Sequence, residues 1–421
     1  MVRDPRTDKG LVVAVIIAFL VVSQPWRVTR AQQNSLPPWA EFGISVATAA
    51  DTIFVAAVPT RNGTREASTV DVFQRRQSSW VRTGVLPVPE VSVEEVFGVS
   101  MATDGDTLVV GAQFADRKGD DSGLAYVFER IGEQWHSATV LSASDAAAGD
   151  QFGLTVSVSG GTIAVGARLV DSGGRDAGAT YVFARRGGTW QQIEKLMASD
   201  ARAGDLFGRV SVDRNTMLVT ADLNDDRGVN AGKAYALENR NGTWVEVGTI
   251  LPSDGNGGDE FGVSVALANE TAVFGAAGSK ARGADSGAAY LFERQDGRWA
   301  QMTRLTPDDG APGQMFGFAV AASRDTIVAG APNHSGNGKR AGAAYVFERR
   351  GDEWRQAAKL VPSDAAPEMW FGNTVAVSGD RIVVGMLLIG QVKHTGAAYV
   401  FERRQGSWVE TARLLPDIAP R

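Results

Sequence analysis

The chain has 421 residues, a formal net charge of −6 and no cysteine. The absence of cysteine excludes disulfides, thiolate metal sites and thiol nucleophiles, and the acidic balance argues against non-specific nucleic-acid binding by a basic surface. Glycine is abundant, with 49 residues, which is typical of a fold with many tight turns.

The first 31 residues have the features of a secretory signal peptide. Arg3, Arg6 and Lys9 precede the apolar run Gly10–Val22, which is too short to span a bilayer comfortably, and a small-residue cleavage site follows at Ala31. We expect residues 1–31 to direct export of a secreted, periplasmic or cell-surface protein. Residues 32–41 are then a short lead-in, and the mature chain has no membrane span.

A repeat of about 55 residues fills the rest of the chain. Each copy begins with a Phe-Gly pair and carries a tryptophan at a fixed distance from it. The copies begin at Phe42, Phe97, Phe152, Phe207, Phe261, Phe316 and Phe371. All six tyrosines occupy one repeat position, where the first copy has Asp71. Seven such copies predict one repeat domain over residues 42–417.

Each copy predicts four short strands and no helix. In the second copy the strands are Val99–Thr103, Thr107–Ala112, Leu124–Arg130 and Trp135–Leu141. The second strand, TLVVGA, is nearly continuously apolar, which suits a sheet buried on both faces. A lone four-stranded sheet cannot bury both of its faces, so the sheets must pack on one another.

We therefore predict an all-β fold, a seven-bladed β-propeller of four-stranded antiparallel blades. An open β-solenoid is the alternative, although solenoid turns are usually shorter than this repeat. The last copy contains its own fourth strand, Trp408–Leu415. We expect the ring to close mainly by packing of one blade on the next.

The pattern FG…VVGA…GAAYVF resembles the FG-GAP repeat of integrin alpha chains and many exported bacterial proteins. The best matches are FGVS…LVVGA…GLAYVFER in the second copy and FGFAV…IVAGAPN…GAAYVFERR in the sixth. The resemblance covers about residues 42–415. It implies the seven-bladed propeller and an adhesion or interaction role, and it is far more specific for the fold than for the function.

Integrin-type repeats often carry a calcium loop between the first and second strands, and this chain departs from that pattern. Calcium takes six to eight oxygen ligands, whereas these connections are tight hairpins and Ser159–Thr162 has no carboxylate. We predict no metal site of the family type and no cofactor. A weak calcium site in the loops of copies two to four is the alternative.

The loops between the second and third strands differ most among the copies, and we predict that they bind the ligand. Variable loops on a rigid scaffold commonly carry binding. Aspartates gather in these loops in copies two to four, whereas solvated, turn-forming aspartate is the alternative role. The candidate ligand-binding residues are Asp116, Asp120, Asp121, Asp171, Asp176, Asp222, Asp225 and Asp226.

The links between copies hold fourteen acidic residues and a single arginine, Arg202. Regularly spaced acids lie seven residues before the next Phe-Gly pair, which favours a turn-forming role. These acids are Glu90, Asp145, Asp200, Asp254, Asp309 and Asp364. Strand alternation places links and variable loops on one face, which we expect to be negative and to attract cationic partners or divalent ions.

No catalytic residue is assigned. The three histidines, His136, His334 and His394, lie in different copies and outside any motif. We predict a binding or adhesion module for a protein or a glycan. The alternatives are a polysaccharide hydrolase or lyase, which would need paired carboxylates at the channel mouth, and a structural spacer in a surface assembly.

The signal peptide is tested by the mass and N-terminal sequence of the exported protein. We expect the mature chain to begin at Gln32, and Ala31→Trp to block cleavage because the cleavage site requires a small residue. An exported protein that still begins at Met1 would contradict the prediction.

Overall fold

The computed structural model describes residues 41–58, 60–61, 64–65, 67–88, 92, 95–388 and 396–416. The signal peptide, and the lead-in apart from residue 41, lie outside these ranges and stay predictions. Every regular element in the described residues is a β-strand. In this part of the chain, no helix of the length and apolarity needed to cross a membrane occurs.

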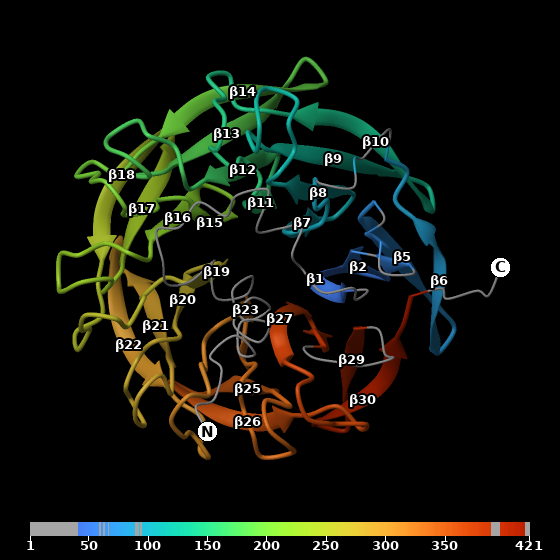
Figure 1. Ribbon diagram of the computed structural model, residues 1–421. Coiled ribbons are helices and arrows are strands. Elements are labelled where there is room, and N and C mark those ends of the chain that lie inside the picture. Colours follow the sequence, from blue (N-terminus) through green and yellow to red (C-terminus); the bar gives the residue numbers. More distant parts are fainter. Residues whose placement is uncertain are drawn as a thin grey trace, which may run out of the picture.

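Seven sheets, each of four antiparallel strands, surround one axis (Figure 1). The first strand of each blade lies nearest the axis, and the fourth lies at the rim. The first strands are β1 (Glu41–Ala49), β7 (Met101–Asp104), β11 (Thr155–Ser159), β15 (Arg209–Asp213), β19 (Ser264–Ala268), β23 (Val320–Ser323) and β27 (Phe371–Ser378). The second strands are β2 (Thr52–Val58), β8 (Thr107–Ala112), β12 (Thr162–Ala167), β16 (Thr216–Ala221), β20 (Thr271–Ala276), β24 (Thr326–Ala331) and β28 (Arg381–Met386).

The outer half of each blade is a hairpin. The third strands are β5 (Thr69–Arg76), β9 (Leu124–Ile131), β13 (Ala179–Arg186), β17 (Lys233–Arg240), β21 (Ala288–Gln295), β25 (Ala343–Arg350) and β29 (Ala397–Arg404). The fourth strands are β6 (Ser79–Val85), β10 (Gln134–Leu141), β14 (Thr189–Leu196), β18 (Thr243–Ile250), β22 (Arg298–Leu305), β26 (Glu353–Leu360) and β30 (Ser407–Leu414). Blade 1 also contains a small hairpin of β3 (Thr60–Arg61) and β4 (Thr64–Arg65). The predicted seven-bladed propeller is confirmed.

Two glycines of the repeat face each other across the blade interfaces. A Cβ added at Gly330, near the end of β24, would lie 1.9 Å from the carbonyl oxygen of Gly372, the glycine of the next Phe-Gly pair. A side chain there would push the two blades apart. Blade 4 instead carries Thr220, whose Oγ1 donates a 2.7 Å hydrogen bond to the carbonyl oxygen of Gly262. The Gly-Ala ending of the second strand thus permits the close approach of neighbouring blades.

The aromatic residues of the repeat fill the space around these contacts. The rings of Phe97 and Tyr126 are 5.2 Å apart and nearly perpendicular, and similar pairs recur in later blades. Trp135 on β10 packs edge-on against Phe54 of the preceding blade, with ring centroids 5.0 Å apart. Edge-to-face pairs are favourable beyond the area that they bury. Trp135 therefore crosses a blade interface.

Ion pairs join the third strands of neighbouring blades. The glutamate at the middle position of the segment Phe-Glu-Arg in one blade, or of Leu-Glu-Asn in blade 4, binds the arginine at the last position of the equivalent segment in the next blade. Nη1 of Arg349 lies 3.0 Å from Oε1 of Glu293. The equivalent pairs are Arg185–Glu129, Arg294–Glu238, Arg403–Glu348 and Arg75–Glu402. The glutamate and arginine positions of this segment therefore mark contacts between blades.

The ring closes by packing of two complete blades. All four strands of blade 7 come from the C-terminal end of the chain, and those of blade 1 come from the N-terminal end. A Cβ at Gly385 would lie 2.4 Å from the carbonyl oxygen of Gly43, which repeats the glycine contact of the other interfaces. The Arg75–Glu402 pair repeats the ion pair. The predicted mode of closure is confirmed.

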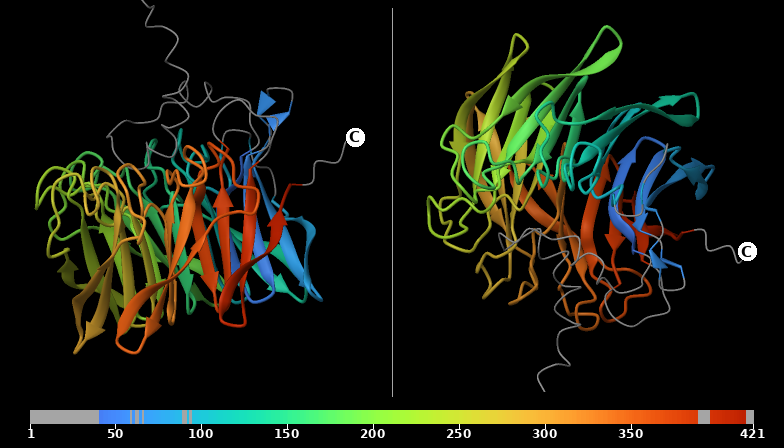
Figure 2. Two further views of the ribbon diagram at one scale, coloured as in Figure 1. Left: turned by 90° about the horizontal axis from the view of Figure 1, so that it is seen from below. Right: turned by 45° about the horizontal axis from the view of Figure 1, so that its top comes forward.

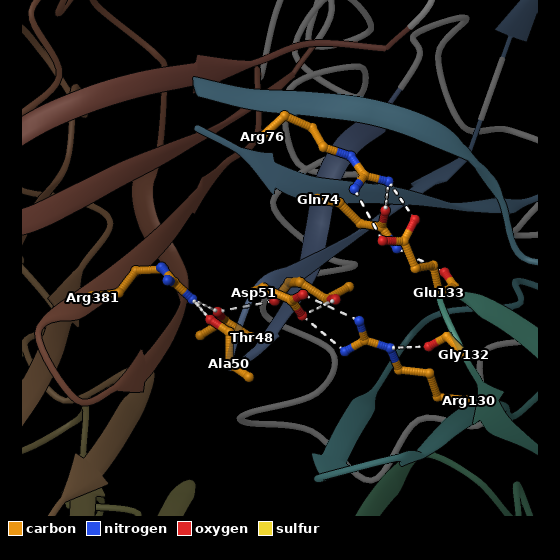
Figure 3. Close-up of polar contacts among 10 residues, drawn as sticks. Thr48, Ala50, Asp51, Gln74, Arg76, Arg130, Gly132, Glu133 and Arg381 are labelled. Atoms are coloured by element: carbon orange, nitrogen blue, oxygen red, sulfur yellow. Dashed lines mark hydrogen bonds and ion pairs between the residues drawn. The ribbon is translucent and has the colours of Figure 1, made fainter. Parts of the chain in front are cut away.

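Blade 1 is held from both sides near its first hairpin (Figure 3). Arg381 of blade 7 donates hydrogen bonds to the carbonyl oxygen of Ala50 and to Oγ1 of Thr48. From the other side, Arg130 of blade 2 forms a 2.8 Å ion pair with Asp51. The first blade is therefore tied to both of its neighbours.

The two faces of the propeller differ (Figure 2). The loops between second and third strands lie on one face together with the links between blades, and we call this the loop face. The hairpins between first and second strands, and between third and fourth strands, lie on the other, the hairpin face. The prediction that loops and links share a face is confirmed.

The ring closure is tested by Glu402→Ala. The variant should lower the free energy of unfolding by about 1–3 kcal/mol, because Arg75 loses its charged acceptor. Glu293→Ala is a matched control, since the exposed fractions of Arg349 and Glu293, 32% and 12%, nearly equal those of Arg75 and Glu402, 33% and 11%. Chemical denaturation at neutral pH should give similar losses. If Glu293→Ala lowered the free energy of unfolding and Glu402→Ala left it unchanged, the described closure of the ring would be contradicted.

Candidate functional site

The five links that follow blades 2 to 6 are each hydrogen-bonded to the variable loop of the blade that precedes them. Between blades 2 and 3, the N–H of Gly149 donates to the carbonyl oxygen of Asp120 at 2.8 Å, and that of Phe152 donates to Ser122 at 3.1 Å. Between blades 4 and 5, Gly258 and Phe261 donate to the loop of blade 4 at 2.8 and 3.0 Å. The same pattern follows blades 3, 5 and 6. Backbone bonding therefore fixes the loops in position.

The regularly spaced link aspartates bind the blade that follows. Asp200 and Asp364 each accept a 2.7 Å hydrogen bond from the repeat tyrosine of the next blade, Tyr235 and Tyr399. Each of the five aspartates also pairs with a cation of that blade. These pairs are Asp145–Lys195, Asp200–Lys233, Asp254–Arg304, Asp309–Lys359 and Asp364–Arg413. These acids thus stabilise the links through tyrosine and lysine or arginine, where the sequence suggests turns.

Burial and the nearby carboxylate together keep the repeat tyrosines protonated. Burial, followed by the neighbouring Asp254, raises the pKa of Tyr290 to about 12. In the first link, Glu90 lies outside the described residues. There Tyr126 donates a 2.9 Å hydrogen bond to Glu95. In blade 1, Asp71 replaces the tyrosine and pairs with Arg82.

A second set of link carboxylates forms the turns. Asp150 and Asp205 accept the backbone N–H three residues earlier, from Ala147 at 2.8 Å and from Arg202 at 3.1 Å. Asp259 accepts the N–H of Asn256 in the same way. Burial raises the pKa of all three carboxyls. The turn-forming role therefore belongs to the residues two positions before the Phe-Gly pair.

The link cluster of blade 6 includes a buried histidine. Oδ2 of Asp309 accepts a hydrogen bond from Lys359 at 2.6 Å, and Oδ1 accepts one from Tyr345 at 2.7 Å. Burial alone would raise the pKa of Asp309, but these two hydrogen bonds lower it to about 2. Buried His334 places Nε2 3.2 Å from Oδ2, and its Nδ1 accepts the N–H of Gly336. Burial, together with the Lys359 cation, lowers the pKa of His334, so the imidazole is neutral at pH 7.

Three of the predicted ligand-binding aspartates organise their own loops. Asp116, Asp171 and Asp225 each accept the backbone N–H five residues later, at 2.8–2.9 Å. Two of the N–H donors, at Asp121 and Asp176, belong to residues of the same predicted set with positive φ, 54° and 55°. Aspartate is among the few residues that adopt this conformation readily. Their ligand-binding role stays a prediction.

The other three predicted residues have different surroundings. Asp120 is exposed, and its carbonyl oxygen accepts from the following link. Asp226 pairs with Lys233 at 2.7 Å and with Arg202 at 2.9 Å. Asp222 has no exposed surface. The structure therefore spreads the predicted set over three loops and assigns Asp222 to the interior.

Asp222 belongs to a buried ionic cluster that joins blades 3, 4 and 5. It pairs with Arg168 of blade 3, whose Nε also donates to the carbonyl oxygen of Leu206, and lies 3.5 Å from Nε of Arg209. Burial, with the Asp222 charge, raises the pKa of the adjacent Glu260 to about 8. Breaking a buried ion pair is strongly destabilising, so this cluster has a structural role. It could not be found from the spacing of single residues.

Exposed cations are a feature of the loop face that the sequence analysis missed. Each variable loop of blades 2 to 6 exposes at least one, and these include Lys118, Arg175, Arg227, Lys280 and Lys339. The side chains of Arg175 and Lys339 are both 73% exposed. The expected negative face therefore has many of its carboxylates paired, with cations at the tips of its loops.

The connections between first and second strands are too short for a calcium loop of the family type. The connection between β11 and β12 is a two-residue hairpin, with Ser159 paired to Thr162, and the equivalent connections of blades 4 to 7 have the same form. Among the described residues, no group of three or more His, Asp or Glu side chains could hold a metal ion. His136 is exposed on β10, and His394 lies outside the described residues.

The blade 6 cluster gives a pH-dependent prediction. Since the pKa of Asp309 is lowered in the folded state, its contribution is full above about pH 4 and is lost as the pH falls through about 2. Asp309→Asn should lower the free energy of unfolding at pH 7 by about 1–2 kcal/mol. Between pH 4 and pH 2, the free energy of unfolding of this variant should decrease less than that of the unaltered chain. Asp308→Asn, one residue away, is the control, with an expected change below about 0.5 kcal/mol. Denaturation curves that are the same for the two variants would refute the assignment.

Comparison with known families agrees with the geometry. The FG-GAP repeat family model matches residues 80–128, 135–183, 190–237, 244–292, 299–347 and 354–401. Each matched segment starts at the repeat tryptophan of one blade and ends in the third strand of the next, so the family unit includes the link and crosses a blade interface. No curated protein matches the chain. The matched segments cover more than half of the sequence, and the chain belongs to the FG-GAP repeat family.

Proposed function

We propose that this chain is an exported interaction module that binds a macromolecular partner, a protein or a glycan, through the loop face. The observation that carries the proposal is the backbone bonding of the links after blades 2 to 6 to the preceding loops, as between Gly149 and Asp120. Five loops of different sequence are held in this way on one face of one ring. Ordered loops lose little conformational entropy when a partner binds, so such a face is preorganised.

The chemistry of the loops supports contacts by their tips. The cations Lys118, Arg175 and Lys339 are exposed there, whereas Asp116 and Asp171 bond inward to their own loops. Val229, at the tip of the blade 4 loop, is 71% exposed. Arginine and exposed apolar side chains are common in protein interfaces, and arginine also binds the carboxylate and sulfate groups of glycans.

Export and a cell-surface, periplasmic or secreted location are part of this proposal and rest on residues 1–31. An adhesion role would follow if the partner lies on another cell or on a surface polymer. The proposal gives the chain a binding role and no reaction, and no observation on the described residues favours the hydrolase or lyase alternative.

The proposal is tested by site-specific photocross-linking in the organism that makes the protein. A photoreactive residue in place of Val229 should cross-link the partner, because this position projects from the loop face. Ile131, which is 67% exposed on the hairpin face, is the matched control. Partner capture from position 131 and not from position 229 would overturn the assignment of the face, and capture from neither position would overturn the proposal.

The same assay measures the contribution of the predicted aspartates. A triple variant with Asn at Asp116, Asp171 and Asp225 removes three charges and keeps an acceptor for each backbone N–H. Cross-linking from position 229 should be retained if the tips make the contacts. Its loss in a variant that folds normally would assign binding to the carboxylate charges instead.

A further inference from the structure

A pocket of about 320 Å³ lies on the hairpin face, where blade 7 meets blade 1. Its lining contains the end of the first hairpin of blade 7, at Ser378 and Asp380, and the ends of β5 and β29. Four arginines face it, and these are Arg75, Arg381, Arg403 and Arg404. The pocket is on the side of the propeller opposite to the proposed partner surface, so it is independent of that proposal.

The lining has more cations than anions. Its two carboxylates are Glu402, which pairs with Arg75 and lies 3.6 Å from Arg404, and Asp380, which is 3.1 Å from Arg403. Four guanidinium groups therefore face two carboxylates. Arg403 also reaches Glu348 of blade 6, and a positive charge remains when this third carboxylate is counted.

Arg381 distinguishes this interface from the other six. The second strand begins with threonine in every other blade, at Thr52, Thr107, Thr162, Thr216, Thr271 and Thr326. The arginine of blade 7 adds a charge at the one place where the first and last blades meet. A residue that departs from the repeat in a single copy marks a feature specific to that copy.

Neutral groups hold the Arg381 side chain in place. Its Nη1 donates to the carbonyl oxygen of Ala50 and to Oγ1 of Thr48 (Figure 3). Its guanidinium also lies 4.4 Å from the centre of the Trp80 ring. No carboxylate of the described residues is within ion-pair distance of it, and its buried Nε has no hydrogen-bond acceptor there. The cation is therefore oriented by backbone, hydroxyl and aromatic groups, and its charge is not neutralised by a direct ion pair.

We propose that this pocket binds a tetrahedral oxyanion, a phosphate or sulfate group, either free or as an ester on a larger molecule. Guanidinium groups bind such oxyanions with paired, charge-assisted hydrogen bonds, and Ser378 adds a hydroxyl donor to the rim. The volume accommodates one group of this size with water. An anion here would join residues of blades 7 and 1 and would strengthen the ring closure.

Calorimetric titration of the mature chain with inorganic phosphate, at constant ionic strength set by chloride, tests the proposal. We expect saturable binding of one phosphate per chain. Arg381→Thr restores the residue of the other blades and should weaken binding at least about tenfold. Arg350→Thr is the control, because it removes an equal charge from the end of β25 in blade 6, at the position equivalent to Arg404 and outside the pocket. It should bind as the unaltered chain does.

Three results would overturn the proposal. They are phosphate binding no stronger than that of chloride, full binding by Arg381→Thr, and an equal loss in Arg350→Thr, which would show a general charge effect. If Arg381→Thr fails to fold, Arg404→Thr replaces it. Arg404 is 56% exposed and its ion pair with Glu402 is long, at 3.6 Å, so its replacement should disturb the fold less. Titrations with sulfate and with glycerol 3-phosphate separate the sources, because a pocket for esters must bind the monoester as well as the free ion.

Discussion

Neighbouring blades approach so closely that most interfaces require a glycine on each side. At Gly330 and Gly372 the contact is between a Cα and a backbone carbonyl, with no room for a Cβ. Because each blade buries its faces only against its neighbours, this constraint is repeated around the ring, and the closure uses it again at Gly385 and Gly43. Farther from the axis, the aromatic residues fill the interface, and the Glu-Arg ion pairs join the third strands of the two blades.

The links hold the variable loops in fixed positions on the packed blades, and so form a surface that can bind a partner. One link residue, such as Phe152, bonds back to the preceding loop, and another, such as Asp200, bonds forward to the tyrosine and lysine of the next blade. A loop is therefore held by the same contacts that hold two blades together. The loops are free to differ in sequence because their position depends on backbone atoms. It also depends on a turn acceptor that recurs in blades 2 to 4, at Asp116, Asp171 and Asp225.

The fold was predictable from the sequence because its determinants recur at one period: Phe-Gly, the glycine of the second strand, the tyrosine and the tryptophan. The role of the link acids was only partly predictable, because Asp309 meets Lys359 and Tyr345 across 50 and 36 residues. The burial of Asp222 depends on Arg168, 54 residues away, at a position that differs between blades. Arg381 could have been noticed, since it replaces a threonine present in every other copy, but only the structure shows that it faces a pocket between the first and last blades.

The loop face is rigid because links and loops share backbone hydrogen bonds. Amide hydrogen exchange on the mature chain tests it most directly. The N–H groups of Gly149, Phe152, Gly258 and Phe261 should be protected to the same degree as amides inside β9 and β17, because they donate to the loops. Exchange of these link amides as fast as that at the exposed hairpin tips Gly132 and Gly187 would show a mobile face and contradict the claim.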